Sequence, residues 1–215
     1  MGLPVKFFCG TNANDIFYRT VNTGRFHKRD LVRTMSEAIN IQVPYNFERI
    51  LYFLFDRDSP KLKAWMEQGV EREGKADVPP AQLSRLRDMI QCARVEDKDM
   101  LDVIRSSWDQ HRYLVDPHTA VILAAHRQLV GLPGQSSPPC VLLSTAHACK
   151  FEEALRESLG DKFWDTEMPS FMPPSAAALY TLPERPAPAF RQGEDWTQRL
   201  QELVEASYSE QNAKL

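Results

Sequence analysis

The chain has 215 residues, of which 43% are hydrophobic and 26% are charged, with a net charge of −3. This length allows one domain, or one and a half, with a sizeable core. The slightly acidic balance gives no electrostatic case for nucleic-acid binding, and no run of about 18 apolar residues predicts a membrane span. The first residues lack a basic leader and a long apolar core, so we expect no signal peptide and a cytoplasmic protein, with secretion by another route left open.

The cysteines lie far apart in the sequence, at Cys9, Cys92, Cys140 and Cys149. This scatter suits a reducing compartment and predicts free, mostly buried thiols rather than a disulfide framework. The spacing of Cys140, His147 and Cys149 matches no structural zinc pattern, so we expect no metal site.

Residues 4–9 are predicted to form a core strand, and the polar turn 10–15 follows it. Asp15 is expected to cap a short helix that carries Ile16, Phe17 and Val21. Asn12, Asn14 and Asp15 have two open interpretations. They could hold a polar ligand at the end of the strand, or they could form the turn and cap the helix.

The spacing of apolar residues predicts a series of helices between residues 31 and 130. The first is expected to carry Leu31, Met35 and Ala38 on one face and to end before Pro44. Later helices begin where a capping residue or a proline suits the first turn. These starts are Asn46, Ser59-Pro60, Pro79-Pro80 (with Leu83, Leu86, Met89 and Ile90 on one face) and Asp116-Pro117, and a further helix carries Leu101, Ile104 and Trp108.

The apolar run 140–143 is predicted to be a short buried strand that ends in the hydroxyls of Ser144 and Thr145. An amphipathic helix with Phe151 and Leu155 follows. Hydroxyls between a strand and a helix are expected at the carboxyl edge of an α/β sheet, where such folds bind ligands. From these residues alone, a structural role is favoured over ligand binding: the two hydroxyls would satisfy the strand end or cap the helix.

The composition changes after Gly160, because six prolines before Arg191 are expected to interrupt regular structure. Helical spacing returns from Trp196. We therefore expect a main region over residues 1–160, a proline-rich irregular segment over 161–192 and a terminal helix over 193–215. Two isolated strands cannot make a stable sheet. The chain is either a helical protein with a small ribbon, or its other strands belong to sequence outside these residues.

His118 and His147 each follow an expected helix start. Each could be a site histidine, or it could donate to a nearby backbone carbonyl. The nine glycines form no phosphate-cradling loop, and no self-sufficient catalytic motif is present.

Four blocks of sequence together resemble threonine synthase and the threonine synthase-like proteins, in the order of that family. They are Gly2-Leu-Pro-Val-Lys6 with Thr11-Asn-Ala-Asn-Asp15, Ala38-Ile-Asn-Ile-Gln-Val-Pro-Tyr-Asn-Phe-Glu-Arg49, Asp116-Pro-His-Thr-Ala-Val121, and Ser144-Thr-Ala-His-Ala-Cys-Lys-Phe151. The resemblance covers residues 1 to about 155 and, more weakly, the final helix.

The resemblance implies an α/β fold, namely the carboxy-terminal part of a fold-type II enzyme dependent on pyridoxal 5'-phosphate, mostly helical with a few sheet strands. It implies phosphate elimination from O-phosphohomoserine or O-phosphothreonine, giving threonine, or 2-oxobutanoate and ammonia. Thr145 matches the residue that bonds the pyridine nitrogen of the cofactor, with Ser144 beside it. Asn12, Asn14, Asp15, His118 and His147 match family blocks as candidate neighbours of the active site.

In the family, a Schiff-base lysine and most of the phosphate cradle precede the block that begins at Gly2. We therefore expect no catalytic residue in this chain, doubtful cofactor binding, and no activity from the chain alone. The expected partners are a small phosphorylated amino acid, and either a second copy or the missing amino-terminal half, but no nucleic acid and no membrane. The alternative is a non-enzymatic interaction or signalling protein derived from the same family.

Overall fold

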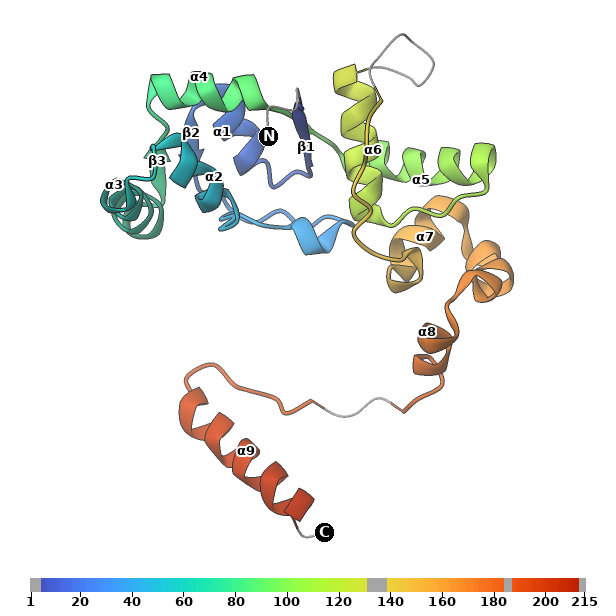
Figure 1. The fold of residues 1–215 in the computed structure, drawn as a ribbon. Helices are drawn as coiled ribbons and strands as arrows, with labels where there is room; N and C mark the ends of the chain where they lie inside the picture. Colours follow the sequence, from blue (N-terminus) through green and yellow to red (C-terminus); the bar gives the residue numbers. More distant parts are fainter. Residues whose placement is uncertain (1–4, 131–138, 184–186, 213–215) are drawn as a thin grey trace. The chain divides into compact units, whose positions relative to one another are not determined.

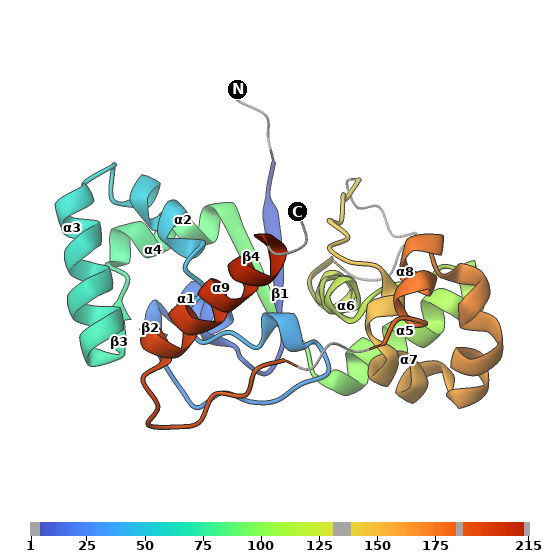
Figure 2. The same cartoon turned by 90° about the horizontal axis from the view of Figure 1, so that it is seen from below.

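A computed structural model describes residues 5–130, 139–183 and 187–212, which form two compact units, Met1–Pro173 and Pro174–Leu215 (Figure 1). The centre of the first unit is a parallel pair of strands, β1 (Phe7–Thr11) and β4 (Ile90–Arg94). Helix α1 (Ile16–Thr23) packs on one face of this pair and α6 (Pro117–Val130) on the other. Figures 1 and 2 both show β1 between these helices.

Alternation along β1 explains this layering. Cys9 packs against the same buried cluster as Ile16 and Val21, whereas Phe8 and Gly10 face α6. A Cβ atom at Gly10 would lie 2.9 Å from the carbonyl oxygen of Val121, so only glycine allows α6 to approach so closely. A parallel pair with helices on both faces is the arrangement of α/β proteins, which confirms the predicted fold class.

A second ribbon lies beside this layer. Strand β2 (Arg25–His27) pairs antiparallel with β3 (Lys75–Asp77), and four helical segments surround the ribbon. These are α2 (Phe47–Leu54), α3 (Ser59–Ala64), the π-helix η2 (Trp65–Glu73) and α4 (Pro80–Met89). Phe26 is at their centre, stacked 6.0 Å from Phe47 and edge-on to Trp65 at 5.3 Å.

The remainder of the first unit is helical. Helix α5 (Asp97–His111) packs against α6 and α7 (Glu152–Leu159). Short turns follow as η4 (Phe163–Glu167) and η5 (Met168–Phe171), and η1 (Glu37–Ile39) and η3 (Ala148–Lys150) lie in the connections. Trp108 fixes this part by contacting Phe163 and Phe171 at ring distances of 5.0 and 5.2 Å.

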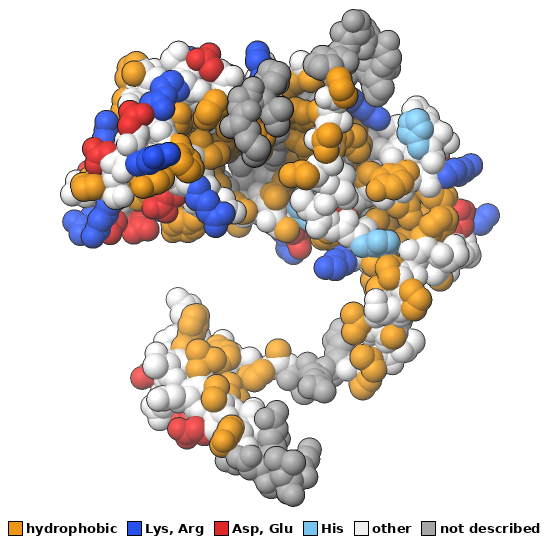
Figure 3. Space-filling view, viewed as in Figure 1, with side chains coloured by type: hydrophobic (Ala, Val, Ile, Leu, Met, Phe, Trp, Pro, Cys, Tyr) orange, Lys and Arg blue, Asp and Glu red, His pale blue; other side chains and the backbone are white. Residues whose placement is uncertain are grey.

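The second unit consists of α8 (Pro174–Leu179) and α9 (Trp196–Asn212). Four apolar side chains recur four residues apart along α9 and are exposed, namely Trp196, Leu200, Val204 and Tyr208. Apolar side chains are visible on both helices in Figure 3. No helix among the described residues is both long enough and apolar enough to cross a membrane.

Most predicted helices are confirmed, but their caps differ. The carboxylate of Asp58 accepts from the backbone N–H of Lys61, so Asp58 and not Ser59 caps α3. Asp15 and Asn46 occupy cap positions without a capping hydrogen bond. Helix α4 ends at Met89, and Ile90 belongs to β4 instead of the helix, because β1 pairs with it.

Two predicted elements are wrong. Residues 31–36 form no helix, because the side-chain amide of Asn14 binds both the N–H and the carbonyl of Val32. Residues 140–143 form no buried strand, and Val141 and Leu143 are 85% and 79% exposed. No described strand lies beside this run, and a strand requires a hydrogen-bonding neighbour.

The proline-rich part contains short helical turns at η4, η5 and α8, each of which begins near a proline or glycine. The boundaries at residues 160 and 192 stay a prediction. The sequence also predicts a loop over residues 131–139, almost all of which lies outside the described residues. Of the four cysteines, none in a disulfide, Cys92 and Cys149 are buried, Cys9 is half-buried and Cys140 is exposed.

Candidate functional site

A buried polar cluster lies at the carboxyl end of β1. The Asn12 amide nitrogen donates to the Thr34 hydroxyl at 2.8 Å, the Ser36 hydroxyl at 3.0 Å and the Asn40 carbonyl oxygen at 2.8 Å. Its own carbonyl oxygen accepts from the Asn14 backbone at 2.9 Å. Each of these four atoms lies within hydrogen-bonding distance of the Asn12 amide, which holds the segment 34–40 against the strand end.

Asp15 has a different role from the two asparagines. Its buried carboxylate pairs with Arg19 at 2.8 Å and with Arg94 at 3.4 Å, and Arg29 lies 3.9 Å away. Opposite charges therefore already surround this carboxylate. Asp15 thereby joins α1 to β4.

Replacing Asn12 with alanine should lower the free energy of unfolding by about 2–4 kcal/mol, because hydroxyl and amide groups would stay buried without their partner. Asn22, exposed on α1 with a single hydrogen bond to a backbone carbonyl, is the matched control. Its alanine variant should change stability by less than about 0.5 kcal/mol. Urea unfolding followed by circular dichroism measures both, and equal losses would show that the cluster contributes nothing specific.

A second cluster is built on Asp116, whose side chain is completely buried before α6. Its carboxylate accepts from the backbone N–H of His118 at 3.0 Å, from the His118 ring Nδ1 at 2.9 Å and from the Thr119 hydroxyl. Burial raises the pKa of Asp116, but the hydrogen bonds from His118 and Thr119 outweigh it, so the pKa is lowered overall. The carboxylate stays ionised and orders the start of α6.

His118 connects the two clusters. Its Nε2 accepts from the backbone N–H of Ala38 at 3.1 Å, so Nε2 carries no proton in this arrangement and Nδ1–H donates to Asp116. The ring also meets Phe151 edge-on at 4.9 Å. His118 is thus a buried connector between the segment after Ser36 and α6, and both of its nitrogens are occupied.

Ser144 and Thr145 are attached to α6 through Thr119. The hydroxyls of Thr119 and Ser144 lie 3.2 Å apart, and the backbone N–H of Thr145 donates to the Thr119 hydroxyl at 3.4 Å. Both residues are exposed. The Thr145 hydroxyl makes no hydrogen bond within the described parts of the chain, so it remains available to a ligand.

His147 does not join these clusters. Its Nδ1 accepts from the backbone N–H of Cys149 at 3.2 Å and caps η3. The sequence left open that His147 donates a hydrogen bond to a nearby backbone carbonyl. In the structure its Nδ1 instead accepts from a backbone N–H. Its ring is exposed, beside the same segment as Thr145.

The structure thus connects five predicted residues through hydrogen bonds into one group, which we call the polar edge: Asn12, Asn14, His118, Ser144 and Thr145. Asn12 and Asn14 hold the segment 34–40, His118 joins that segment to Asp116, and Thr119 carries Ser144 and Thr145. Sequence reasoning missed some of the connecting residues, namely Thr34, Ser36, Asn40 and Thr119. Thr34 and Ser36 are short polar residues in a segment that the sequence predicts to be helical, and Asn40 and Thr119 lie within blocks that resemble the family.

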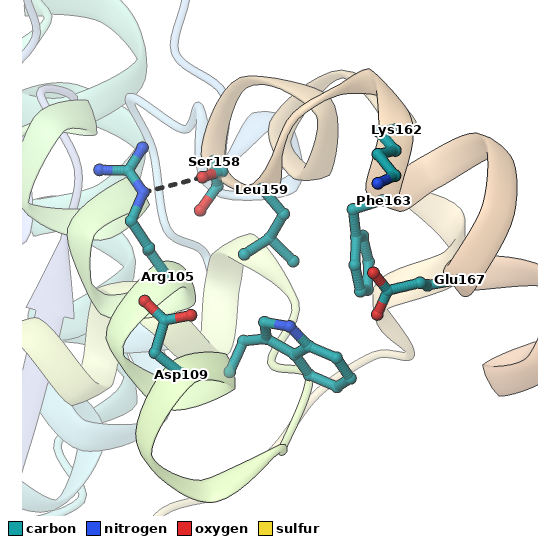
Figure 4. Close-up of a pocket in the computed structure, with 8 residues that line it drawn as sticks. Arg105, Asp109, Ser158, Leu159, Lys162, Phe163 and Glu167 are labelled. Carbon is teal, nitrogen blue, oxygen red and sulfur yellow. Dashed lines mark hydrogen bonds between the residues drawn. The ribbon is translucent and has the colours of Figure 1, made fainter.

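A separate hollow of about 300 Å³ lies between α5, α7 and η4 (Figure 4). Arg105, Asp109, Lys162 and Glu167 give its walls charges of both signs, and Trp108 and Phe163 lie beside them. Arg105 donates to the carbonyl of Ser158 at 2.9 Å, which ties α5 to α7. None of the predicted site residues lines this hollow.

Comparison with known proteins agrees with the fold. Residues 119–203 match the family described as "Threonine synthase, C-terminal". Threonine synthase-like 2 of Rattus norvegicus is 34% identical over 209 residues, which are 96% of this chain and 41% of that protein. The chain thus spans about two fifths of the length of this relative.

Two solved structures are similar. Threonine synthase from yeast superposes with a TM-score of 0.79 at 26% identity, over 100% of this chain and 44% of the yeast chain. The pyridoxal phosphate-bound threonine synthase of Brucella melitensis gives 0.67 at 32% identity, over 74% and 34%. The fold is therefore that of the carboxy-terminal portion of a fold-type II pyridoxal phosphate enzyme. The chain belongs to the threonine synthase and threonine synthase-like family.

Proposed function

We propose that this chain supplies the pyridine-nitrogen side of a pyridoxal phosphate site in a threonine synthase-like phospho-lyase. The observation that carries the proposal is the Thr145 hydroxyl, which is exposed and without a partner among the described residues while its backbone is held by Thr119. A threonine hydroxyl can donate to an aromatic ring nitrogen and leave that nitrogen unprotonated. The described residues therefore fit one side of the cofactor.

The proposed reaction is phosphate elimination from O-phosphohomoserine or O-phosphothreonine, giving threonine, or 2-oxobutanoate with ammonia. Bound cofactor would supply the electron sink for this reaction. The chain's own contribution is positioning. Asn12 and His118 have their polar atoms occupied by neighbouring groups, so they fix the edge that presents Thr145 and do not act on the substrate.

We expect the 215 residues to be inactive alone, because they contain no counterpart of the family's anchoring lysine block. Activity then requires the part of the relatives that this chain does not span. The exposed run at Val141 and Leu143 is where we propose that this part pairs, since an apolar extended segment without a neighbouring strand is a site for strand addition. The proposed partner is thus the amino-terminal part of a threonine synthase-like protein.

A two-chain experiment tests this proposal. The 215-residue chain is mixed with pyridoxal phosphate and each phosphorylated amino acid, with and without a separately produced polypeptide covering the unspanned part of threonine synthase-like 2. Release of inorganic phosphate is expected only with both chains. Assays for threonine and 2-oxobutanoate then separate the two reactions. Turnover by the 215-residue chain alone, or none from a mixture that forms a stable complex, would contradict the proposal.

Thr145 variants test the role of the hydroxyl in the two-chain complex. Thr145→Val keeps the shape and removes the donor, so phosphate release should fall roughly 5–150-fold, the effect of losing about 1–3 kcal/mol of hydrogen bonding. Thr145→Ser keeps a hydroxyl and should retain most activity. The cofactor's absorbance should change with Thr145→Val and not with Thr145→Ser. Equal activity of the two variants would remove Thr145 from the cofactor site.

One observation favours the non-enzymatic alternative. Trp196, Leu200, Val204 and Tyr208 leave an apolar stripe exposed on α9, and such stripes are typical of helices that bind a partner. In that reading α9 mediates self-association. Light scattering after size-exclusion chromatography should then show a dimer that Leu200→Glu dissociates, with Gln201→Glu as the control on the exposed neighbouring position. A monomer at all concentrations would argue against it.

A further inference from the structure

Two cysteines face each other across the central strand pair. The register of the parallel ladder places Cys9 of β1 directly opposite Cys92 of β4. Both side chains point to the same side of the sheet, because Cys92 belongs to the core cluster around Ile16 and Cys9 packs against that cluster. Neighbouring strands lie about 4.8 Å apart, which is within the range of Cα separations that a disulfide bridges.

The two thiols are chemically unequal. The neighbouring Cys92 side chain lowers the pKa of Cys9, and the neighbouring Cys9 together with burial raises the pKa of Cys92. Cys92 is buried, whereas Cys9 is only half-buried. Because the thiolate is the form that reacts, Cys9 is the attacking sulfur and Cys92 the resolving one.

We propose that Cys9 and Cys92 form a reversible disulfide by exchange with a low-molecular-weight disulfide. The Cys9 thiolate attacks one sulfur of the small disulfide, whose S–S bond breaks and releases one thiolate, leaving a mixed disulfide on Cys9. Cys92 then loses its proton and attacks the Cys9 sulfur, releasing the second small thiolate. The two electrons and the two cysteine protons end on the two small thiols.

This bond would fasten β1 to β4 just before the strand ends that carry the polar edge. Thr11 and Val95 are already joined there by a backbone hydrogen bond of 2.8 Å. The closed loop contains α1 and the whole β2–β3 ribbon with its helices, and cross-links over long loops restrict the unfolded chain strongly. Oxidation should therefore raise the melting temperature by roughly 5–10 °C. This inference does not depend on the proposed catalytic function.

The test uses the full chain with Cys140→Ser, which removes the exposed thiol. Incubation with oxidised glutathione under native conditions should consume two of the three remaining thiols, with loss of mass equal to two hydrogens. Tryptic digestion should link the peptide of residues 7–19 to that of residues 88–94, and reduction should separate them. Cys92→Ser should retain glutathione on Cys9, whereas Cys9→Ser should leave Cys92 unmodified.

The same exchange in guanidinium chloride is the control for folding, because an unfolded chain should also link Cys149 to either partner. Identical linkage patterns with and without denaturant would overturn the proposal. So would a persistent glutathione adduct on Cys9 without the cross-link, or no loss of thiols at all.

Discussion

Replacing Asp116 with alanine should lower the free energy of unfolding by about 3–5 kcal/mol, a large share of the stability of an average domain. The carboxylate accepts from the His118 ring, the Thr119 hydroxyl and the backbone at the start of α6. Alanine would leave these donors buried and unpaired. It would also free Thr119, which holds Ser144 and Thr145, so the candidate cofactor edge should loosen with the fold.

Asp109→Ala is the matched control for Asp116→Ala, because Asp109 is an exposed aspartate near the end of α5. This control should change stability by less than about 0.5 kcal/mol. Urea unfolding at neutral pH measures both variants. If they lose equal stability, the buried carboxylate is not the anchor that its hydrogen bonds indicate.

The contribution of Asp116 should also depend on pH. Its pKa in the folded protein is below the ordinary value, because its hydrogen bonds outweigh the opposing effect of burial. The unfolded chain therefore takes up a proton first as the pH falls below about 4. The stabilisation is fully present above that pH and is lost as the pH falls through the folded-state pKa. The stability difference between wild type and Asp116→Asn should accordingly shrink in acid.

Replacing Phe26 with alanine should lower the free energy of unfolding by about 3–5 kcal/mol through loss of apolar burial and the cavity left behind. Phe26 is 1% exposed and lies between Phe47 and Trp65. Phe53→Ala is the control, because Phe53 is 58% exposed at the end of α2. It should cost less than about 1 kcal/mol. Thermal and urea unfolding distinguish the two, and similar losses would contradict the placement of Phe26 at the centre of this core.

The sequence was most informative where a helix buries one stripe of side chains. Ile104 and Trp108 on α5 have the spacing that predicts their shared face, and both are buried. Pairing between strands that are far apart in the sequence leaves no comparable spacing of apolar residues. Ile90 continued the apolar spacing of the helix before it, yet it lies in β4 because β1 offers hydrogen bonds there.

The candidate site was predictable only in part for the same reason. Thr145 and Asn12 stand out as hydroxyl or amide residues beside expected strand ends, and the family resemblance points to both. Thr34, Ser36 and Asn40 become recognisable only once Asn12 is folded against them. The run at Val141 looks like a strand because its side chains suit one, but a strand also needs a neighbour, which the described residues do not provide.

The pairing of β1 with β4 has a consequence for synthesis on the ribosome. Phe7 lies opposite Ile90, so the first strand leaves the exit tunnel long before its partner has been translated. At about 5–20 residues per second, the wait is roughly 4–17 s. During this time β1 is without its partner strand β4, whereas α1 can form at once. We expect ribosome-bound chains that end before β4 to be bound by chaperones and easily cleaved by protease within residues 5–11, and chains that extend beyond α6 to be protected.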